Sequence, residues 1–108
     1  MREKKQIHEW AIDHACAAIR GYEVRRQYLE RHASASDAVT RRYAKYNRLI
    51  DSALNEVCGC KGEAEAIRDS IIQGVPWERI PNCPCGRRRF YELKREVIER
   101  TAQLLRLF

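Results

Sequence analysis

Long apolar segments are missing from this chain of 108 residues. No run approaches the roughly 18 apolar residues that a membrane-spanning helix needs. The first residues, 1–6, are mostly charged and do not resemble a signal peptide. These absences predict a protein that has no membrane partner and stays in the cytoplasm, where it is made.

Enzyme motifs are missing as well. The sequence has neither a phosphate-binding glycine loop nor a nucleophile motif. Its three histidines, His8, His14 and His32, are scattered, and no cysteine or carboxylate accompanies them at the spacing of metal ligands. We therefore predict that the protein is not an enzyme, and we assign it no catalytic residue and no cofactor.

The sequence also lacks an internal repeat and the alternation of apolar and polar residues that is typical of strands. Apolar residues recur instead at steps of three and four, as in amphipathic helices. This spacing predicts an all-α fold. The expected helices span about residues 5–31, 37–57, 63–73, 76–80 and 86–107.

The first two helices are expected to pair as an antiparallel hairpin with a shared aromatic seam. Small polar residues at 33–36 compete with the helix for backbone hydrogen bonds and end the first helix, which is expected to loosen at Gly21. Ser36 is a suitable N-cap for the second helix, with Asp37 in its first turn. Residues 1–61 are therefore predicted to form an N-terminal helical hairpin.

Residues 62–108 have the order of elements that is typical of a helix-turn-helix. Gly74 ends one helix, Pro76 suits the first position of a very short helix, and a turn at 81–86 leads into a long last helix. The chain is thus expected to combine an N-terminal pair of long helices with a helix-turn-helix part in one compact unit.

Basic side chains gather at the start of the long helix. A core face at helical spacing takes up Phe90, Leu93 and Val97. The side chains that consequently point outward are assigned to DNA binding: Arg87, Arg88, Tyr91, Lys94 and Arg95. A recognition helix contacts base edges with its N-terminal residues, and arginine is the usual partner of guanine. The net charge of +6 suits the same polyanionic partner, whereas a solvated arginine face on an ordinary helical bundle is the alternative interpretation.

Two segments resemble a known family. The sequences GVPWERIP, residues 74–81, and GRRRFYELKREVI, residues 86–98, are similar to the C-terminal part of RinA/ArpU-type phage transcription regulators. Those proteins resemble region 4 of bacterial sigma factors, the part that contacts the −35 promoter element. The Cys-Pro-Cys turn at 83–85 departs from the family pattern, which more often has an ordinary polar turn at this place.

The resemblance implies a sequence-specific DNA-binding transcription regulator of a phage or prophage. Such a protein would bind double-stranded promoter DNA in the cytoplasm of the bacterial host, act with the host RNA polymerase and activate late genes. Carried over by position, the DNA-facing residues would be Arg87, Arg88, Tyr91 and Arg95. The scaffold residues would be Trp77, Ile80 and Phe90.

Two other functions fit the sequence. A DNA-recognition subunit of a packaging enzyme, similar to a small terminase, would form a ring with a large oligomerisation surface. A helical adaptor would use the basic face to bind an acidic protein such as polymerase. The solution mass separates the packaging subunit from a regulator, and DNA binding with a steep salt dependence counts against the adaptor.

The chain has five cysteines, Cys16, Cys58, Cys60, Cys83 and Cys85. An odd number without an export signal predicts reduced thiols in the cytosol. The last four form two C-x-C pairs, which could supply four thiolates to zinc, although zinc knuckles usually use C-x-x-C. The alternative is free cysteines that act as small buried apolar side chains. No metal ligand is assigned.

Overall fold

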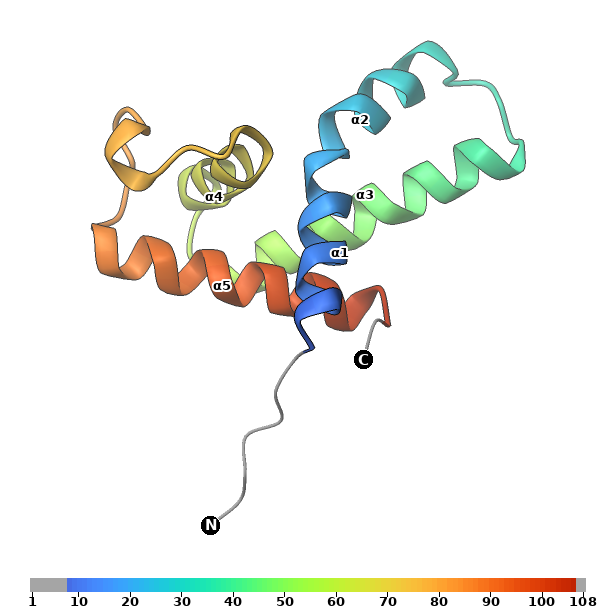
Figure 1. Ribbon diagram of the computed structural model, residues 1–108. Coiled ribbons are helices and arrows are strands. Elements are labelled where there is room, and N and C mark those ends of the chain that lie inside the picture. Colours follow the sequence, from blue (N-terminus) through green and yellow to red (C-terminus); the bar gives the residue numbers. More distant parts are fainter. Residues whose placement is uncertain (1–7, 107–108) are drawn as a thin grey trace.

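The computed structural model describes residues 8–106 and shows helices and turns, with no strand among these residues (Figure 1). The elements are α1 (Glu9–Arg20), α2 (Tyr22–Arg31), α3 (Ala38–Val57), α4 (Lys61–Gln73), the three-residue 3-10 helix η1 (Trp77–Arg79) and α5 (Arg87–Leu104). The predicted all-α class is confirmed. The predicted extensions of the first helix to residue 5 and of the last to residue 107 lie outside the described residues.

The first predicted helix is two helices, and the break between them is at Gly21, where the helix was expected to loosen. α1 ends and α2 begins at Gly21, which has little helix propensity. The Arg25 guanidinium occupies the space beside this glycine and donates a hydrogen bond to the Ala18 carbonyl, near the end of α1. A Cβ at position 21 would lie 2.6 Å from Arg25 Nη1, so a larger residue there would displace that side chain.

Three other helix starts differ from the prediction, and one of them is that of α4, which begins at Lys61 and not at residue 63. The N-cap of α3 is Asp37, not Ser36, because the Asp37 carboxylate accepts a hydrogen bond of 2.8 Å from the Thr40 N–H. The same hydrogen bond lowers the pKa of Asp37. At the short helix, Pro76 occupies the N-cap position, and only residues 77–79 are helical.

α2 and α3 form the antiparallel hairpin, which projects from the rest of the molecule at the right of Figure 1. The predicted aromatic seam is present, since the Tyr28 and Tyr43 rings pack edge to face with centroids 5.0 Å apart. Closer to α1, Arg25 Nε donates to Asn47 Oδ1 over 2.8 Å, and Asn47 Nδ2 donates to the Tyr22 carbonyl over 3.1 Å. The hairpin is therefore held by aromatic packing and by a buried polar bridge.

One hydrophobic core connects the N-terminal helices with residues 62–108. It contains Ile19 of α1, Ile50 and Leu54 of α3, Ile67 of α4 and Phe90 of α5, all of them buried. α1 crosses the molecule and packs against both α4 and α5. The orientation of α5 is thus fixed by helices from both parts of the chain. None of the helices in residues 8–106 is long and apolar enough to cross a membrane.

Candidate nucleic-acid interface

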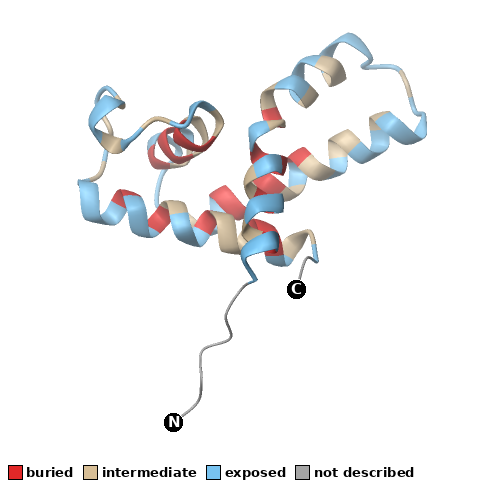
Figure 2. Ribbon diagram, in the orientation of Figure 1, coloured by how far each residue is buried: buried red, intermediate tan, exposed pale blue. Residues whose placement is uncertain are grey.

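The first turn of α5 is basic, because it begins with Arg87, Arg88 and Arg89. It is also exposed, as its pale blue colour at the left of Figure 2 shows. Gly86 is the N-cap, it supplies no side-chain hydrogen bond, and the first turn contains no acidic residue. The first N–H groups of the helix and the positive end of its dipole therefore face solvent. Such a helix start is suited to binding an anion.

Arg88 and Arg95 lie on the exposed side of α5. The Arg88 side chain is 95% exposed, and its only ion pair within residues 8–106 joins its Nε to Glu92 Oε1 over 3.5 Å. Arg95 is seven residues, or about two helical turns, further along on the same side, and it is exposed too. This side is opposite to Phe90 and Leu93, which are buried in the core. Both arginines thus point outward, as predicted.

Arg87 lies at the edge between α5 and η1. Its Nε is 3.3 Å from Glu78 Oε2, and its guanidinium carbon is 5.7 Å from the centre of the Tyr91 ring. The side chain is 67% exposed. Arg87 therefore combines a weak contact to the short helix with access to solvent, so that it can turn toward a ligand at the helix start.

Tyr91 and Lys94 form hydrogen bonds with other residues of the protein. The Tyr91 hydroxyl accepts a hydrogen bond of 3.2 Å from the Trp77 backbone N–H. Lys94 Nζ donates to Ser70 Oγ of α4 over 3.1 Å and lies 6.0 Å from the centre of the Tyr91 ring. The structure thus brings all five predicted residues to one stretch of α5, but these two side chains also hold α5 against α4 and η1.

Arg89 was not among the predicted site residues, and it points away from the exposed side. Its Nε donates to Glu63 Oε2 over 2.8 Å and its Nη2 to Glu63 Oε1 over 3.2 Å. The Glu63 side chain is 8% exposed and also accepts a 2.7 Å hydrogen bond from the Gly59 N–H. Arg89, and to a smaller extent Gly59, lower the pKa of this carboxyl group. The pair connects the start of α4 to the start of α5.

The turn before α5 is held by Trp77. Its indole Nε1 donates to the Cys85 carbonyl over 3.0 Å, and the ring packs against the core together with Ile80. Asn82 takes a left-handed backbone conformation with φ of 55°, which asparagine tolerates better than most residues. Trp77 and Ile80 are therefore scaffold residues that position the turn.

The four cysteines of the C-x-C pairs are free thiols in differing environments. Cys83 Sγ and Cys85 Sγ are 3.9 Å apart. Burial and the nearby Glu63 carboxylate raise the pKa of Cys58 to about 11. Burial and the contact to Cys83 raise the pKa of Cys85 to about 11. Within residues 8–106, no three side chains of histidine, cysteine, aspartate or glutamate are arranged to hold a metal ion.

No protein-family model, no curated protein and no solved structure matches this chain. The similarity of residues 74–98 to RinA/ArpU-type regulators therefore stays a prediction from the motif.

Proposed function

We propose that the protein is a sequence-specific DNA-binding transcription regulator, a phage or prophage late-gene activator that acts with host RNA polymerase in the bacterial cytoplasm. In this proposal α4, η1 and α5 form a sigma-region-4-like helix-turn-helix, and α5 enters the major groove with its N-terminal end first. The similarity of residues 74–98 to the RinA/ArpU type supports the role in transcription.

The observation that carries the proposal is the exposed side of α5 with Arg88 at its first turn. Arg88 is almost fully exposed and extends from the end of the helix that would lie deepest in a groove. A bidentate contact from its guanidinium to the O6 and N7 atoms of guanine would supply direct sequence recognition. Arg95, two turns later, would lie higher and meet phosphate, as would the free N–H groups at the helix start.

The scaffold contacts support the same proposal. The Arg89–Glu63 pair and the Trp77 hydrogen bond to Cys85 fix the start of α5 relative to α4. A rigid helix start is what base recognition requires, because a bidentate hydrogen bond depends on the position and plane of the guanidinium.

The test compares Arg88→Ala with Arg95→Ala on two DNAs. A cognate duplex is first selected from a random pool with the wild-type protein, and affinities are then measured by fluorescence titration at several salt concentrations. Arg88→Ala should cost about 1–3 kcal/mol on the selected duplex and much less on random DNA. Arg95→Ala should weaken both DNAs alike and reduce the slope of log affinity against log salt by about one.

Arg31→Ala is the control, because Arg31 is also exposed but lies on α2 at the tip of the hairpin. If Arg88→Ala and Arg95→Ala weaken binding to the selected duplex and to random DNA equally, α5 is only an electrostatic patch and sequence recognition by α5 is excluded. If neither substitution matters, the proposed role of α5 is wrong.

A further inference from the structure

A second basic region lies outside α5, which itself has six lysines and arginines against three acidic residues. Residues 20–48, which include α2 and most of α3, contain eight lysines and arginines against three acidic residues, a formal charge of +5 out of a total of +6. The hairpin that carries most of these residues lies at the end of the molecule opposite to the start of α5 (Figure 1).

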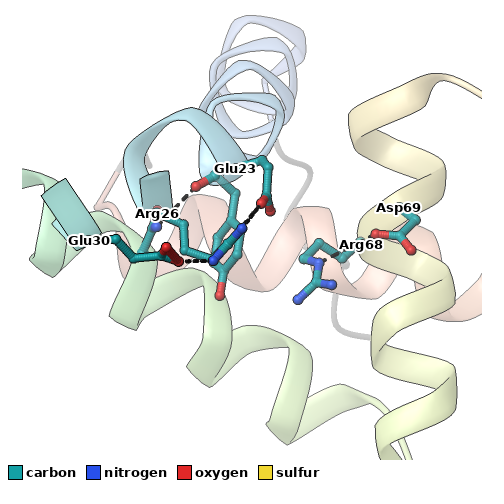
Figure 3. A network of polar contacts seen from close by, with 7 residues as sticks. Glu23, Arg26, Glu30, Arg68 and Asp69 are labelled. Atoms are coloured by element: carbon teal, nitrogen blue, oxygen red, sulfur yellow. Dashed lines mark hydrogen bonds and ion pairs between the residues drawn. The ribbon is translucent and has the colours of Figure 1, made fainter. Parts of the chain in front are cut away.

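The acidic residues of this region are already engaged. Figure 3 shows Arg26 between Glu23 and Glu30, and it forms ion pairs with both. The third acidic residue, Asp37, accepts the N-cap hydrogen bond of α3 from the Thr40 N–H. None of the three is therefore free to neutralise cations on α3.

Four cations lie on the outer side of α3. Arg41, Lys45 and Arg48 follow one another at steps of four and three, so they form a stripe along one side of the helix. Arg42 lies next to this stripe, and all four residues are exposed. None of them forms an ion pair with any residue in the range 8–106, although Arg41 donates a hydrogen bond to the Ser36 carbonyl.

The stripe lies on the side of α3 away from its buried residues Ile50 and Leu54, just as Arg88 and Arg95 lie on the side of α5 away from Phe90 and Leu93. α3 packs against α2 and α5, and α5 packs against α1, α3 and α4. In Figure 1, α2 lies above α3 and α4 lies above α5. The longest extent of the molecule is 47 Å, which corresponds to roughly 14 base pairs of B-DNA at 3.4 Å each.

We infer that the outer side of α3 is a second, sequence-independent DNA contact, in which Arg41, Arg42, Lys45 and Arg48 bind phosphates of the duplex that α5 contacts. The inference rests on the proposed function for the position of α5. Neutralisation of phosphates by these side chains would release counterions and thus add affinity without sequence preference.

The composition of this surface favours a polyanion over a protein partner. Protein interfaces bind through buried apolar and aromatic residues at their centre. Among residues 8–106, the large apolar residues that are exposed are Trp10, Val24, Val39 and Tyr91. Of these only Val39 is on α3, and because it is two residues from Arg41 it lies about 160° around the helix from the stripe.

The test neutralises the stripe in the full chain with the triple substitution Arg41→Gln, Lys45→Gln and Arg48→Gln. The control substitutes glutamine at three exposed cations elsewhere, Arg20, Arg31 and Lys61, and so changes the net charge equally. Thermal unfolding checks that both variants fold. Each protein is titrated with fluorescein-labelled duplexes, one of random sequence and one carrying a selected site, over a series of salt concentrations.

On both duplexes the stripe variant should bind at least about tenfold more weakly at low salt, and its salt slope should fall by about two to three, close to 0.9 for each lost phosphate contact. The control should change affinity less than about threefold, since its cations do not face the duplex. On the selected duplex, the region protected from hydroxyl radicals should shorten on one side.

Failure of this inference is distinguishable from failure of the proposed function. If the stripe variant behaves like the control while Arg88→Ala loses the selected site, the α3 contact is wrong and the role of α5 stands. If the stripe variant keeps DNA binding but loses binding to polyglutamate, this surface fits an acidic protein and the inference is overturned. If random DNA is bound through the stripe but no site can be selected, the sequence-specific function fails and the α3 contact stands.

Discussion

Arginine at the start of α5 is unfavourable for the helix itself. Cations at a helix N-terminus oppose the dipole, where an acidic residue would be stabilising. Arg89 is compensated by Glu63, and Arg87 has a contact to Glu78 of η1. Arg88 is left with a long contact to Glu92 further along its own helix. A residue that destabilises its own helix and has no strong compensating contact is expected at a functional position.

Gly86 allows this idea to be tested with a matched pair. Its φ of −73° suits any residue, and a Cβ there would meet no atom within 4 Å. Gly86→Ser and Gly86→Asp should each raise the free energy of unfolding by a few tenths to about 1 kcal/mol, because both side chains cap the helix. Gly86→Asp should also reduce DNA affinity more than about tenfold, since its carboxylate would repel phosphate.

Chemical denaturation and DNA titration measure the two effects. Gly86→Ser should keep most of the DNA affinity. If Gly86→Asp is more stable and binds DNA as well as Gly86→Ser does, no phosphate lies near the start of α5.

Between elements, an ion pair joins the start of α4 to the start of α5. The Glu63 carboxylate, near the start of α4, accepts hydrogen bonds from the Arg89 side chain of α5 and from the Gly59 N–H of the preceding loop. Its pKa is lowered in the folded protein, first by Arg89 and then by Gly59. The stabilisation from a carboxyl with a lowered pKa is present above its pKa in the unfolded chain and is lost as the pH falls through its pKa in the folded protein.

Glu63→Gln should therefore reduce stability near neutral pH by about 1 kcal/mol, a modest loss because solvent screens the half-exposed Arg89. The difference from the wild type should shrink as the pH falls below about 4, where the wild-type carboxyl also becomes neutral. Thermal unfolding from pH 3 to pH 7 measures this. Glu65→Gln, at an exposed position of the same helix, is the control. A constant difference at all pH values would show that the ion pair contributes nothing.

At the scale of the whole molecule, the hairpin and the proposed DNA-binding part share one core. α5 packs against α1, α3 and α4, so the residues before position 62 are required to orient it. Phe90 is fully buried within this core, and truncation of such a side chain costs about 3–5 kcal/mol. We therefore expect residues 62–108 alone to be much less stable than the complete chain.

The whole-molecule prediction separates transcription from packaging. Light scattering should give the mass of a monomer, 12.7 kDa, or of a dimer, as expected for a regulator. With host polymerase, the protein should raise transcription from a late promoter, with a footprint over or just upstream of the −35 region. A ring of eight or more copies that binds DNA specifically but leaves transcript levels unchanged would instead support the packaging subunit.

The sequence by itself determined the helical class and the outward direction of Arg88 and Arg95. Both follow from local spacing, because a residue's side of a helix depends only on its distance along the chain from the apolar positions. The end of α4 at Gly74 was also determined by the sequence, since the left-handed φ of 67° at this residue favours glycine. The four cations on α3 were also present in the sequence, but spacing alone did not show that they form no ion pair with any residue in the range 8–106.

The tertiary structure decided which of the basic side chains bind to other residues of the protein. Arg89 and Glu63 are 26 residues apart, and Lys94 and Ser70 are 24 apart, so no local pattern pairs them. The break at Gly21 is different, because the sequence already predicted a loosening there from the low helix propensity of glycine. Contacts such as those of Arg89 and Lys94 arise only when helices pack, since the partner of a polar side chain is set by the positions of the helices in space and not by their spacing in the chain.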